Sequence, residues 1–168
     1  MSEKILIACV GNVFLGDDGF GVEVAASLIR RQLPDGVTVK DFGIRGFDLA
    51  YALLDPWDLV VIVDALAHGE APGTLYVIEP DRSGSGDASI NPHGMDPARV
   101  LNLAASMGTI SAQVLVLGCE PHDFGHEFEG RMSLSPPVQA AVEEASNMLL
   151  DLLANRQANP VRLQTMER

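Results

Sequence analysis

Basic residues are scarce in this sequence, long hydrophobic runs are missing, and cysteine occurs only twice. Eleven Lys and Arg stand against twenty-three Asp and Glu in 168 residues, which gives a formal net charge of −12. A protein with this charge repels nucleic acids and anionic lipids. No apolar run approaches the roughly 20 residues that a membrane helix needs. We therefore expect a protein that binds neither nucleic acid nor membranes.

The two cysteines are interpreted as buried free thiols. Cys9 and Cys119 lie within apolar runs and are far apart in the sequence, which is typical of a protein from a reducing compartment. The first apolar run, residues 5–10, is too short for the core of a signal peptide. These features predict a cytoplasmic protein.

The length and composition are those of an ordinary globular protein. Hydrophobic residues make up 47% of the chain and charged residues 20%, which excludes the disordered and the disulfide-stapled classes. At roughly 150 residues per domain, the length predicts one domain. We place this domain at residues 1–155 and expect residues 156–168 to form a polar C-terminal tail that is disordered.

Segments with strand patterns alternate with segments of helical periodicity. The expected strands are 5–10, 37–42, 59–63, 74–79 and 113–117, and the expected helices are 20–29, 47–54, 97–107 and a long one from 136. This alternation predicts an α/β fold in which helices cover both faces of a mostly parallel, twisted, five-stranded sheet. In such folds ligands bind outside the carboxyl ends of the strands.

The Gly-rich segment 11–21, GNVFLGDDGFG, follows the first strand directly. A P-loop is excluded because Asp17 and Asp18 stand where Lys and Ser or Thr would be required, and Val24 stands where a dinucleotide-binding loop needs its third Gly. Two carboxylates at the start of a helix suit a cation better than a phosphate. Capping of that helix is the simpler alternative.

Two further polar residues are expected at the same edge of the sheet. Asp64 follows the wholly apolar third strand, and His93 lies in a loop between the fourth strand and the third helix. Asp18, Asp64 and His93 would together supply two oxygens and one nitrogen, a set suited to nickel or zinc. Each residue taken alone is equally compatible with an ordinary turn or loop position.

The motifs resemble those of the maturation endopeptidases of nickel-iron hydrogenases. The resemblance rests on segment 11–21, on Asp64 after the third strand, on Pro92-His93 and on segment 130–138, GRMSLSPPV. It implies a three-layer α/β/α fold. It also implies that the protein removes a C-terminal peptide from the precursor of the hydrogenase large subunit after nickel has been inserted.

The resemblance further implies that Asp18, Asp64 and His93 contact the nickel. Because the precursor would supply this metal, no permanently bound cofactor is expected. The family commonly carries Asp-Gly-Gly-Thr-x-Gly after the second strand, whereas this chain has Asp41-Phe42-Gly43-Ile44-Arg45-Gly46. Asp41 and Arg45 remain candidates for substrate recognition, since Arg pairs with carboxylates through two hydrogen bonds. A solvated surface position is the alternative for Arg45.

The chemistry of cleavage is less clearly marked in the sequence. There is no Gly-x-Ser-x-Gly motif, and Cys9 lies in an expected buried strand. The simplest hypothesis is that the metal polarises the scissile carbonyl or activates water, with Asp17 as a candidate base. A non-enzymatic nickel-binding chaperone and a zinc-dependent hydrolase with the same ligands are the alternatives. Cys119, Glu120, His122, Asp123 and His126 match no zinc motif and are interpreted as a polar loop.

Overall fold

Five strands form one sheet in the computed structural model, which describes residues 2–82, 96–124 and 132–158. The strands are β1 (Ile5–Val10), β2 (Val37–Gly43), β3 (Leu59–Ala65), β4 (Leu75–Ile78) and β5 (Gln113–Cys119). Their order in the sheet is β2-β1-β3-β5-β4. All neighbours are parallel except β4, which runs antiparallel to β5. The predicted mostly parallel, five-stranded α/β fold is therefore confirmed.

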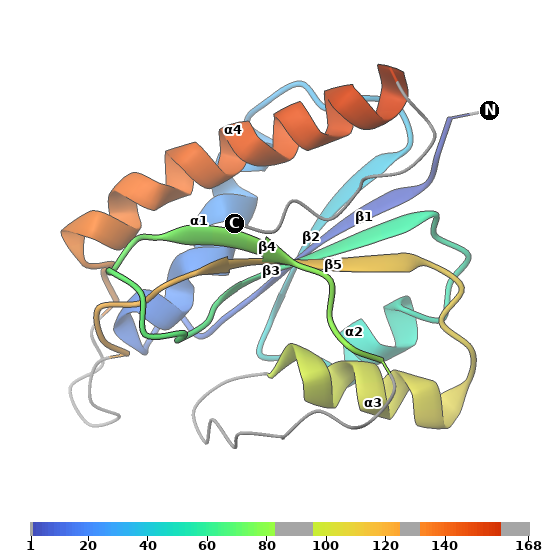
Figure 1. Ribbon diagram of the computed structural model, residues 1–168, viewed down its shortest axis with the longest axis horizontal. Coiled ribbons are helices and arrows are strands. Elements are labelled where there is room, and N and C mark those ends of the chain that lie inside the picture. Colours follow the sequence, from blue (N-terminus) through green and yellow to red (C-terminus); the bar gives the residue numbers. More distant parts are fainter. Residues whose placement is uncertain (1, 83–95, 125–131, 159–168) are drawn as a thin grey trace.

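The helices cover the two faces of the sheet in pairs (Figure 1). They are α1 (Phe20–Ile29), α2 (Gly46–Ala52), α3 (Pro97–Met107) and α4 (Pro136–Ala158), with a short 3-10 helix η1 (Gly16–Gly19) before α1. Helices α1 and α4 pack on one face, and α2 and α3 on the other. This is the expected three-layer arrangement.

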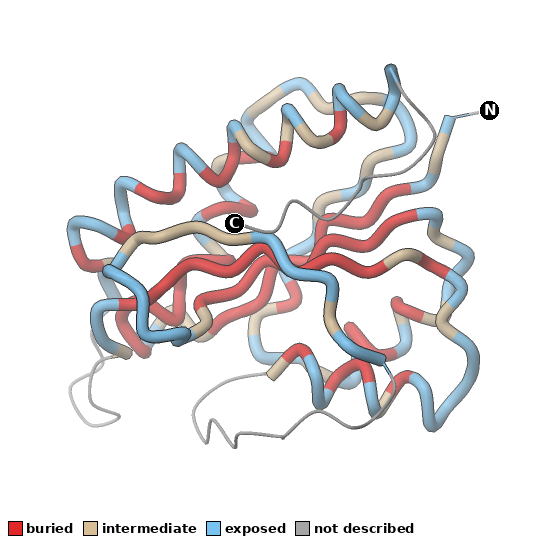
Figure 2. Tube along the Cα trace, in the orientation of Figure 1, coloured by how far each residue is buried: buried red, intermediate tan, exposed pale blue. Residues whose placement is uncertain are grey.

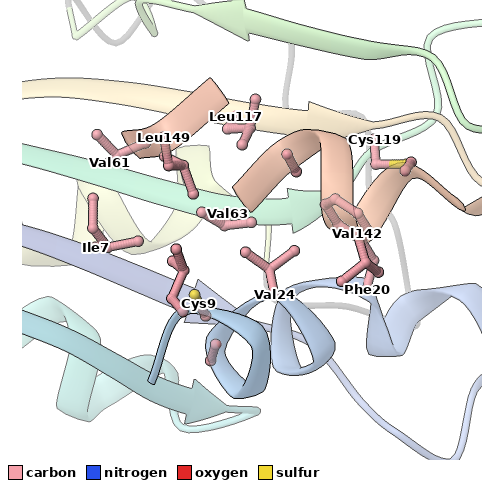
Figure 3. Close-up of a cluster of buried hydrophobic side chains, with 14 of the residues drawn as sticks. Ile7, Cys9, Phe20, Val24, Val61, Val63, Leu117, Cys119, Val142 and Leu149 are labelled. Atoms are coloured by element: carbon pink, nitrogen blue, oxygen red, sulfur yellow. The ribbon is translucent and has the colours of Figure 1, made fainter. Parts of the chain in front are cut away.

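The central strands β1 and β3 are apolar except for Asp64 near the end of β3, because both of their faces are covered. Every residue of β1 and β3 is buried, as Figure 2 illustrates. Side chains alternate between the faces of a strand. Accordingly, Ile7 and Cys9 pack against α1 and α4 (Figure 3), whereas Leu6 and Ala8 pack against α2 and α3.

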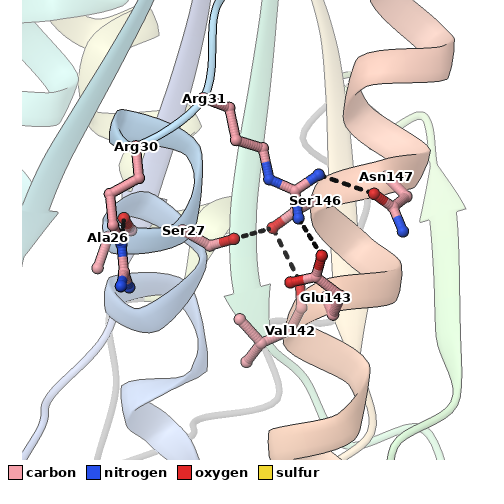
Figure 4. A network of polar contacts seen from close by, with 8 residues as sticks. All are labelled: Ala26, Ser27, Arg30, Arg31, Val142, Glu143, Ser146 and Asn147. Carbon is pink, nitrogen blue, oxygen red and sulfur yellow. Dashed lines mark hydrogen bonds and ion pairs between the residues drawn. The ribbon is translucent and has the colours of Figure 1, made fainter.

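Polar contacts fix α1 against α4 at the edge of their interface (Figure 4). Arg31 forms an ion pair with Glu143 and donates a hydrogen bond of 2.7 Å to Asn147. Deeper in the interface, the hydroxyl groups of Ser27 and Ser146 are 3.0 Å apart. These contacts hold α1 against α4.

Helix α4 continues beyond residue 155, where the sequence placed the end of the domain. Arg156 explains this, because its guanidinium bonds to Glu3 at 2.7 Å and to Gln113 at 3.0 Å. These contacts tie α4 to the amino ends of β1 and β5. Within the described residues, no helix combines the length and the hydrophobicity required to cross a membrane.

The connections on either side of β1 determine where a ligand can bind. The chain leaves β1 through α1 on one face of the sheet and returns from β2 to β3 through α2 on the opposite face. In α/β sheets this reversal opens a crevice at the carboxyl ends of the two adjacent strands. Here those strands are β1 and β3. Strand β1 leads into the Gly-rich segment 11–21, and β3 contains Asp64 as its last residue but one.

Candidate active site

The loop after β1 folds back tightly over the carboxyl ends of the central strands. Gly11 has a φ of +151°, and a Cβ atom there would lie 2.0 Å from the carbonyl oxygen of Asp18. At Gly21 a Cβ would lie 2.2 Å from the carbonyl oxygen of Val10 and 2.6 Å from that of Val63. The glycines of the motif therefore allow close backbone packing, which brings η1 onto the end of β3.

Asp18 and Asp64 are buried carboxyl groups that interact with each other. Each residue is 4% exposed, and one carboxylate oxygen of Asp18 accepts a hydrogen bond of 3.0 Å from the backbone N–H of Asn12. Burial and the nearby charge of Asp18 raise the pKa of Asp64 well above its usual range, against a smaller lowering by a backbone hydrogen bond at Ala65. Two carboxyl groups placed in this way are well suited to share a cation.

The third predicted ligand, His93, lies outside the described residues. Asp64 nevertheless faces the helix that follows this segment, because Asp64 alternates with Val60 and Ile62, which pack against α2 and α3. The charge of Asp96 also raises the pKa of Asp64. Asp96 caps α3, accepting a hydrogen bond of 2.9 Å from the N–H of Ala98, as its position before Pro97 predicts.

A complete metal-binding cluster is not present among residues 2–82, 96–124 and 132–158. No three His, Cys, Asp or Glu side chains in these ranges converge as a metal site would require. Asp18 and Asp64 would supply two oxygen donors, and a metal with four or more coordination positions would need further ligands. The donor chemistry fits a borderline divalent metal if a nitrogen ligand completes the set. The three-residue nickel site therefore stays a prediction.

Asp17 has other hydrogen-bond partners than Asp18 and is fully buried, with 0% exposure. One of its carboxylate oxygens accepts a hydrogen bond of 2.7 Å from the N–H of Ser135. The other accepts bonds from the Ser135 hydroxyl at 2.8 Å and from the N–H groups of His122 and Asp123 at 2.8 and 3.2 Å. The interpretation of Asp17 as a base stays a prediction, but these contacts favour a positioning role.

Asp41 and Arg45 lie together at the carboxyl end of β2. The Asp41 carboxylate accepts a hydrogen bond of 2.8 Å from the N–H of Gly43, which stabilises the turn. Arg45 folds back onto the backbone, donating to the carbonyl oxygens of Asp41 at 2.7 Å and Phe42 at 3.2 Å. Its guanidinium also lies 3.4 Å from Asp48, and its side chain remains 55% exposed. Substrate recognition by this pair stays a prediction.

Glu120, in the segment after β5, and Tyr76, in β4, anchor the loop that follows β3. Glu120 is 5% exposed, and its carboxylate accepts hydrogen bonds from the N–H groups of His68 and Gly69 at 2.7 and 3.2 Å. The hydroxyl of Tyr76 donates to the carbonyl oxygen of Leu66 at 2.5 Å. These bonds fix the loop that follows Asp64. His126, the last member of the predicted polar loop, lies outside the described residues.

Sequence reasoning missed the roles of Glu120 and Ser135. Ser135 is recognisable as a helix start because Pro136 follows it, but nothing near it in the sequence indicates that Asp17 is its partner. Glu120 follows an apolar strand in the same way as Asp64 does. That pattern places Glu120 at the carboxyl edge of the sheet, but it does not distinguish a loop anchor from a metal ligand.

The two cysteines are free and buried, as predicted. Burial, and to a smaller extent the charge of Asp41, raises the pKa of the Cys9 thiol well above its usual range. Burial is also the main reason that the pKa of Cys119 is raised to about 12. Both thiols are therefore protonated at neutral pH, which removes the nucleophilic thiolate that cysteine catalysis requires.

The burial of these thiols predicts that alkylation leaves the native protein unchanged. Iodoacetamide at pH 7.5 should modify neither Cys9 nor Cys119 in the folded protein. Both cysteines should react in denaturant, which serves as the control. Mass spectrometry of the intact protein measures the modification. Alkylation of either cysteine in the folded protein would contradict the assignment of these residues to the core.

Comparison with known proteins identifies the family. The family model described as hydrogenase maturation protease, HycI, matches residues 22–152, which is most of the chain. The chain belongs to this family. Its homologues and structural neighbours are hydrogenase maturation endopeptidases, so this hydrogenase maturation protease is a peptidase.

Individual relatives agree with this assignment. The chain is 35% identical over 158 residues to the hydrogenase expression/formation protein HoxM of Azotobacter vinelandii, a match that covers 91% of this chain and 73% of the relative. It resembles the hydrogenase maturating endopeptidase HybD from E. coli with a TM-score of 0.72 and 26% identity, covering 90% and 93% of the two chains. For the [NiFe] hydrogenase maturation protease HycI from Thermococcus kodakarensis, the TM-score is 0.69 and the identity 26%, with 91% and 94% covered.

Proposed function

We propose that this protease removes a C-terminal peptide from the large-subunit precursor of a nickel-iron hydrogenase and that it recognises the nickel already inserted there. Asp18, Asp64 and His93 are the proposed ligands. The metal arrives as part of the substrate, so the isolated protease requires no bound metal. The proposed partner is therefore the nickel-loaded precursor.

The observation that carries this proposal is the pair of buried carboxyl groups at the carboxyl ends of β1 and β3. Asp18 and Asp64 each have 4% exposure, and the charge of Asp18 disfavours ionisation of Asp64. A divalent cation removes this conflict because it is attracted to both carboxylates. His93 precedes Asp96 by three residues, and Asp96 is close enough to Asp64 to raise its pKa. This proximity supports His93 as the third ligand.

The proposed reaction is hydrolysis assisted by the nickel of the substrate. A divalent metal held by few protein ligands can polarise a scissile carbonyl or activate water. Neither cysteine can act as the nucleophile in its buried, protonated state. We propose that Asp18 and Asp64 orient the metal relative to the scissile bond, while Asp41 and Arg45 contact the precursor beside it.

The mass of the precursor after incubation with the purified protease tests this function. We expect the nickel-loaded precursor to lose a C-terminal peptide, and the two products to account for the full mass plus one water. A nickel-binding chaperone would leave the precursor intact. A zinc-dependent hydrolase would contain zinc when purified and would lose activity on treatment with a chelator before the precursor is added. Either result would refute the proposal.

A further inference from the structure

Asp17 and Asp18 are neighbours in the sequence with different surroundings in the fold. Asp18 interacts with Asp64, whereas Asp17 is enclosed by the segment after β5 and by the start of α4. Both belong to η1, a single turn of four residues. Because so short a turn has little stability of its own, contacts from outside must fix its orientation.

We infer that Asp17 is a positioning residue that holds the carboxylate of Asp18 in place for the metal-containing substrate. This inference rests on the proposed function and extends it to a residue that touches neither metal nor substrate. Asp17 would act by joining three segments that are distant in the sequence. These are η1, residues 122–123 after β5, and Ser135 at the start of α4.

The hydrogen bonds of Asp17 hold η1 from two directions. Its carboxylate accepts from the N–H of Asp123, and its own N–H donates to the carbonyl oxygen of Asp123 at 3.2 Å, so Asp17 is bound to the backbone of Asp123 through both its side chain and its backbone. On the other side, the N–H and the hydroxyl of Ser135 both donate to the carboxylate. This places the negative charge at the N-terminus of the 23-residue helix α4, where the helix dipole stabilises it.

Asp18, the next residue of the same turn, is held by contacts to the loop after β1. Its backbone N–H donates to the carbonyl oxygen of Leu15 at 3.1 Å, and its carboxylate accepts from the N–H of Asn12 at 3.0 Å. The carbonyl oxygen of Asp18 also lies against Gly11, where a Cβ would be only 2.0 Å away. Because this packing leaves little room, a rotation of η1 that followed the loss of the Asp17 contacts would displace the Asp18 carboxylate from Asn12.

Substitution of Asp17 by asparagine keeps the size of the side chain but removes its charge and one of its two acceptor oxygens. Asp17→Asn keeps the shape, but its NH2 group must face N–H donors whichever way the amide is turned, since both carboxylate oxygens accept from backbone N–H groups. Ser135→Ala is the milder variant because it removes only the hydroxyl donor. The matched controls lie far from the site: Arg156→Ala at the amino ends of the strands, and Ser146→Ala between α1 and α4.

Amide hydrogen exchange at Asn12 in the isolated full-length protein tests the inference, because this N–H bonds to the Asp18 carboxylate. At matched global stability, we expect protection of the Asn12 amide to fall at least about tenfold in Asp17→Asn, the equivalent of one lost hydrogen bond. We expect a smaller loss in Ser135→Ala and no selective loss in either control. If Asp17→Asn does not fold, Asn12 protection is compared between Ser135→Ala and Ser146→Ala. Lower protection in Ser135→Ala than in Ser146→Ala then supports the inference, and equal protection overturns it.

Cleavage of the nickel-loaded precursor by the same variants gives the functional readout. We expect kcat/KM to fall in the order of the Asn12 protection losses and to stay at the wild-type value in the controls. Asn12 protection that changes no more in Asp17→Asn and Ser135→Ala than in the controls would overturn the inference. Failure of the wild-type protein to cleave the precursor would instead refute the proposed function. The exchange measurement needs no cleavage and would still test whether Asp17 positions Asp18.

Discussion

Asp64→Asn is expected to stop cleavage of the nickel-loaded precursor and, at the same time, to stabilise the isolated protease. Burial and the charge of Asp18 raise the pKa of the Asp64 carboxyl in the folded protein. At neutral pH this carboxyl therefore lowers the free energy of unfolding. An amide of the same shape carries no charge and still accepts the backbone hydrogen bond at Ala65. As a neutral group it is a far weaker metal ligand. Loss of a residue that only orients a metal ligand lowers activity by about 10- to 100-fold. Because Asp64 is a proposed ligand itself, we expect the cleavage rate to fall at least about a hundredfold.

The stabilisation should depend on pH in a defined direction. Because the pKa of Asp64 is higher in the folded state, the wild-type protein loses stability as the pH rises from about 4 through the raised folded-state pKa. The advantage of Asp64→Asn should therefore be small near pH 4 and full at high pH. One pKa unit corresponds to about 1.4 kcal/mol, so we expect the midpoint temperature of unfolding at pH 8 to rise by at least about 3 °C.

Calorimetry across this pH range, together with the cleavage assay, checks both effects. Asp151→Asn is the control, because Asp151 is exposed on α4. It should change neither the unfolding temperature nor the rate. A variant Asp64→Asn that cleaves at the wild-type rate would remove Asp64 from the site. A variant less stable than the wild type at pH 8 would contradict the raised pKa.

Gly21→Ala is expected to destabilise the protease severely. The added Cβ would lie 2.2 and 2.6 Å from the carbonyl oxygens of Val10 and Val63, which belong to the two central strands. Because backbone atoms cannot move aside as a flexible side chain can, α1 must shift away from the sheet. We expect a loss of at least about 3 kcal/mol, the upper end of the range for overpacked cores. This corresponds to a fall of roughly 6 °C or more in the midpoint temperature.

Gly19→Ala, two residues earlier, is the matched control for Gly21→Ala. Gly19 has an ordinary helical φ of −73°, and a Cβ there would lie no closer than 3.4 Å to any neighbour. Alanine at such a position restricts the unfolded chain and should stabilise the protein by up to about 1 kcal/mol. Thermal unfolding of both variants measures the difference. Equal unfolding temperatures would contradict the close packing of α1 on β1 and β3.

The fold could be predicted in most respects because its signals are local. The apolar runs of β1 and β3 indicate strands buried on both faces, and Asp96-Pro97 indicates the start of α3. The antiparallel direction of β4 could not be predicted, because it depends on the path of the chain between β4 and β5. The extent of α4 could not be predicted, because its anchor, Arg156, bonds to residues more than forty positions away.

The candidate site could be predicted only in part. The proximity of Asp18 and Asp64 could be predicted because strand ends in a parallel sheet share one edge, and in the structure the charge of Asp18 acts on Asp64. Their role as metal ligands stays a prediction. The difference between Asp17 and Asp18 could not be found in the sequence. It depends on hydrogen bonds to residues 122, 123 and 135, more than a hundred positions away. The role of His93 stays a prediction.

The rate of precursor cleavage with and without inserted nickel tests the central proposal most directly. Purified, metal-free protease is mixed with equal amounts of nickel-loaded and nickel-free precursor, and the C-terminal peptide is followed by mass spectrometry. If Asp18 and Asp64 recognise the inserted metal, only the nickel-loaded precursor is cleaved. Equal cleavage of both forms would contradict metal recognition by this pair of carboxylates.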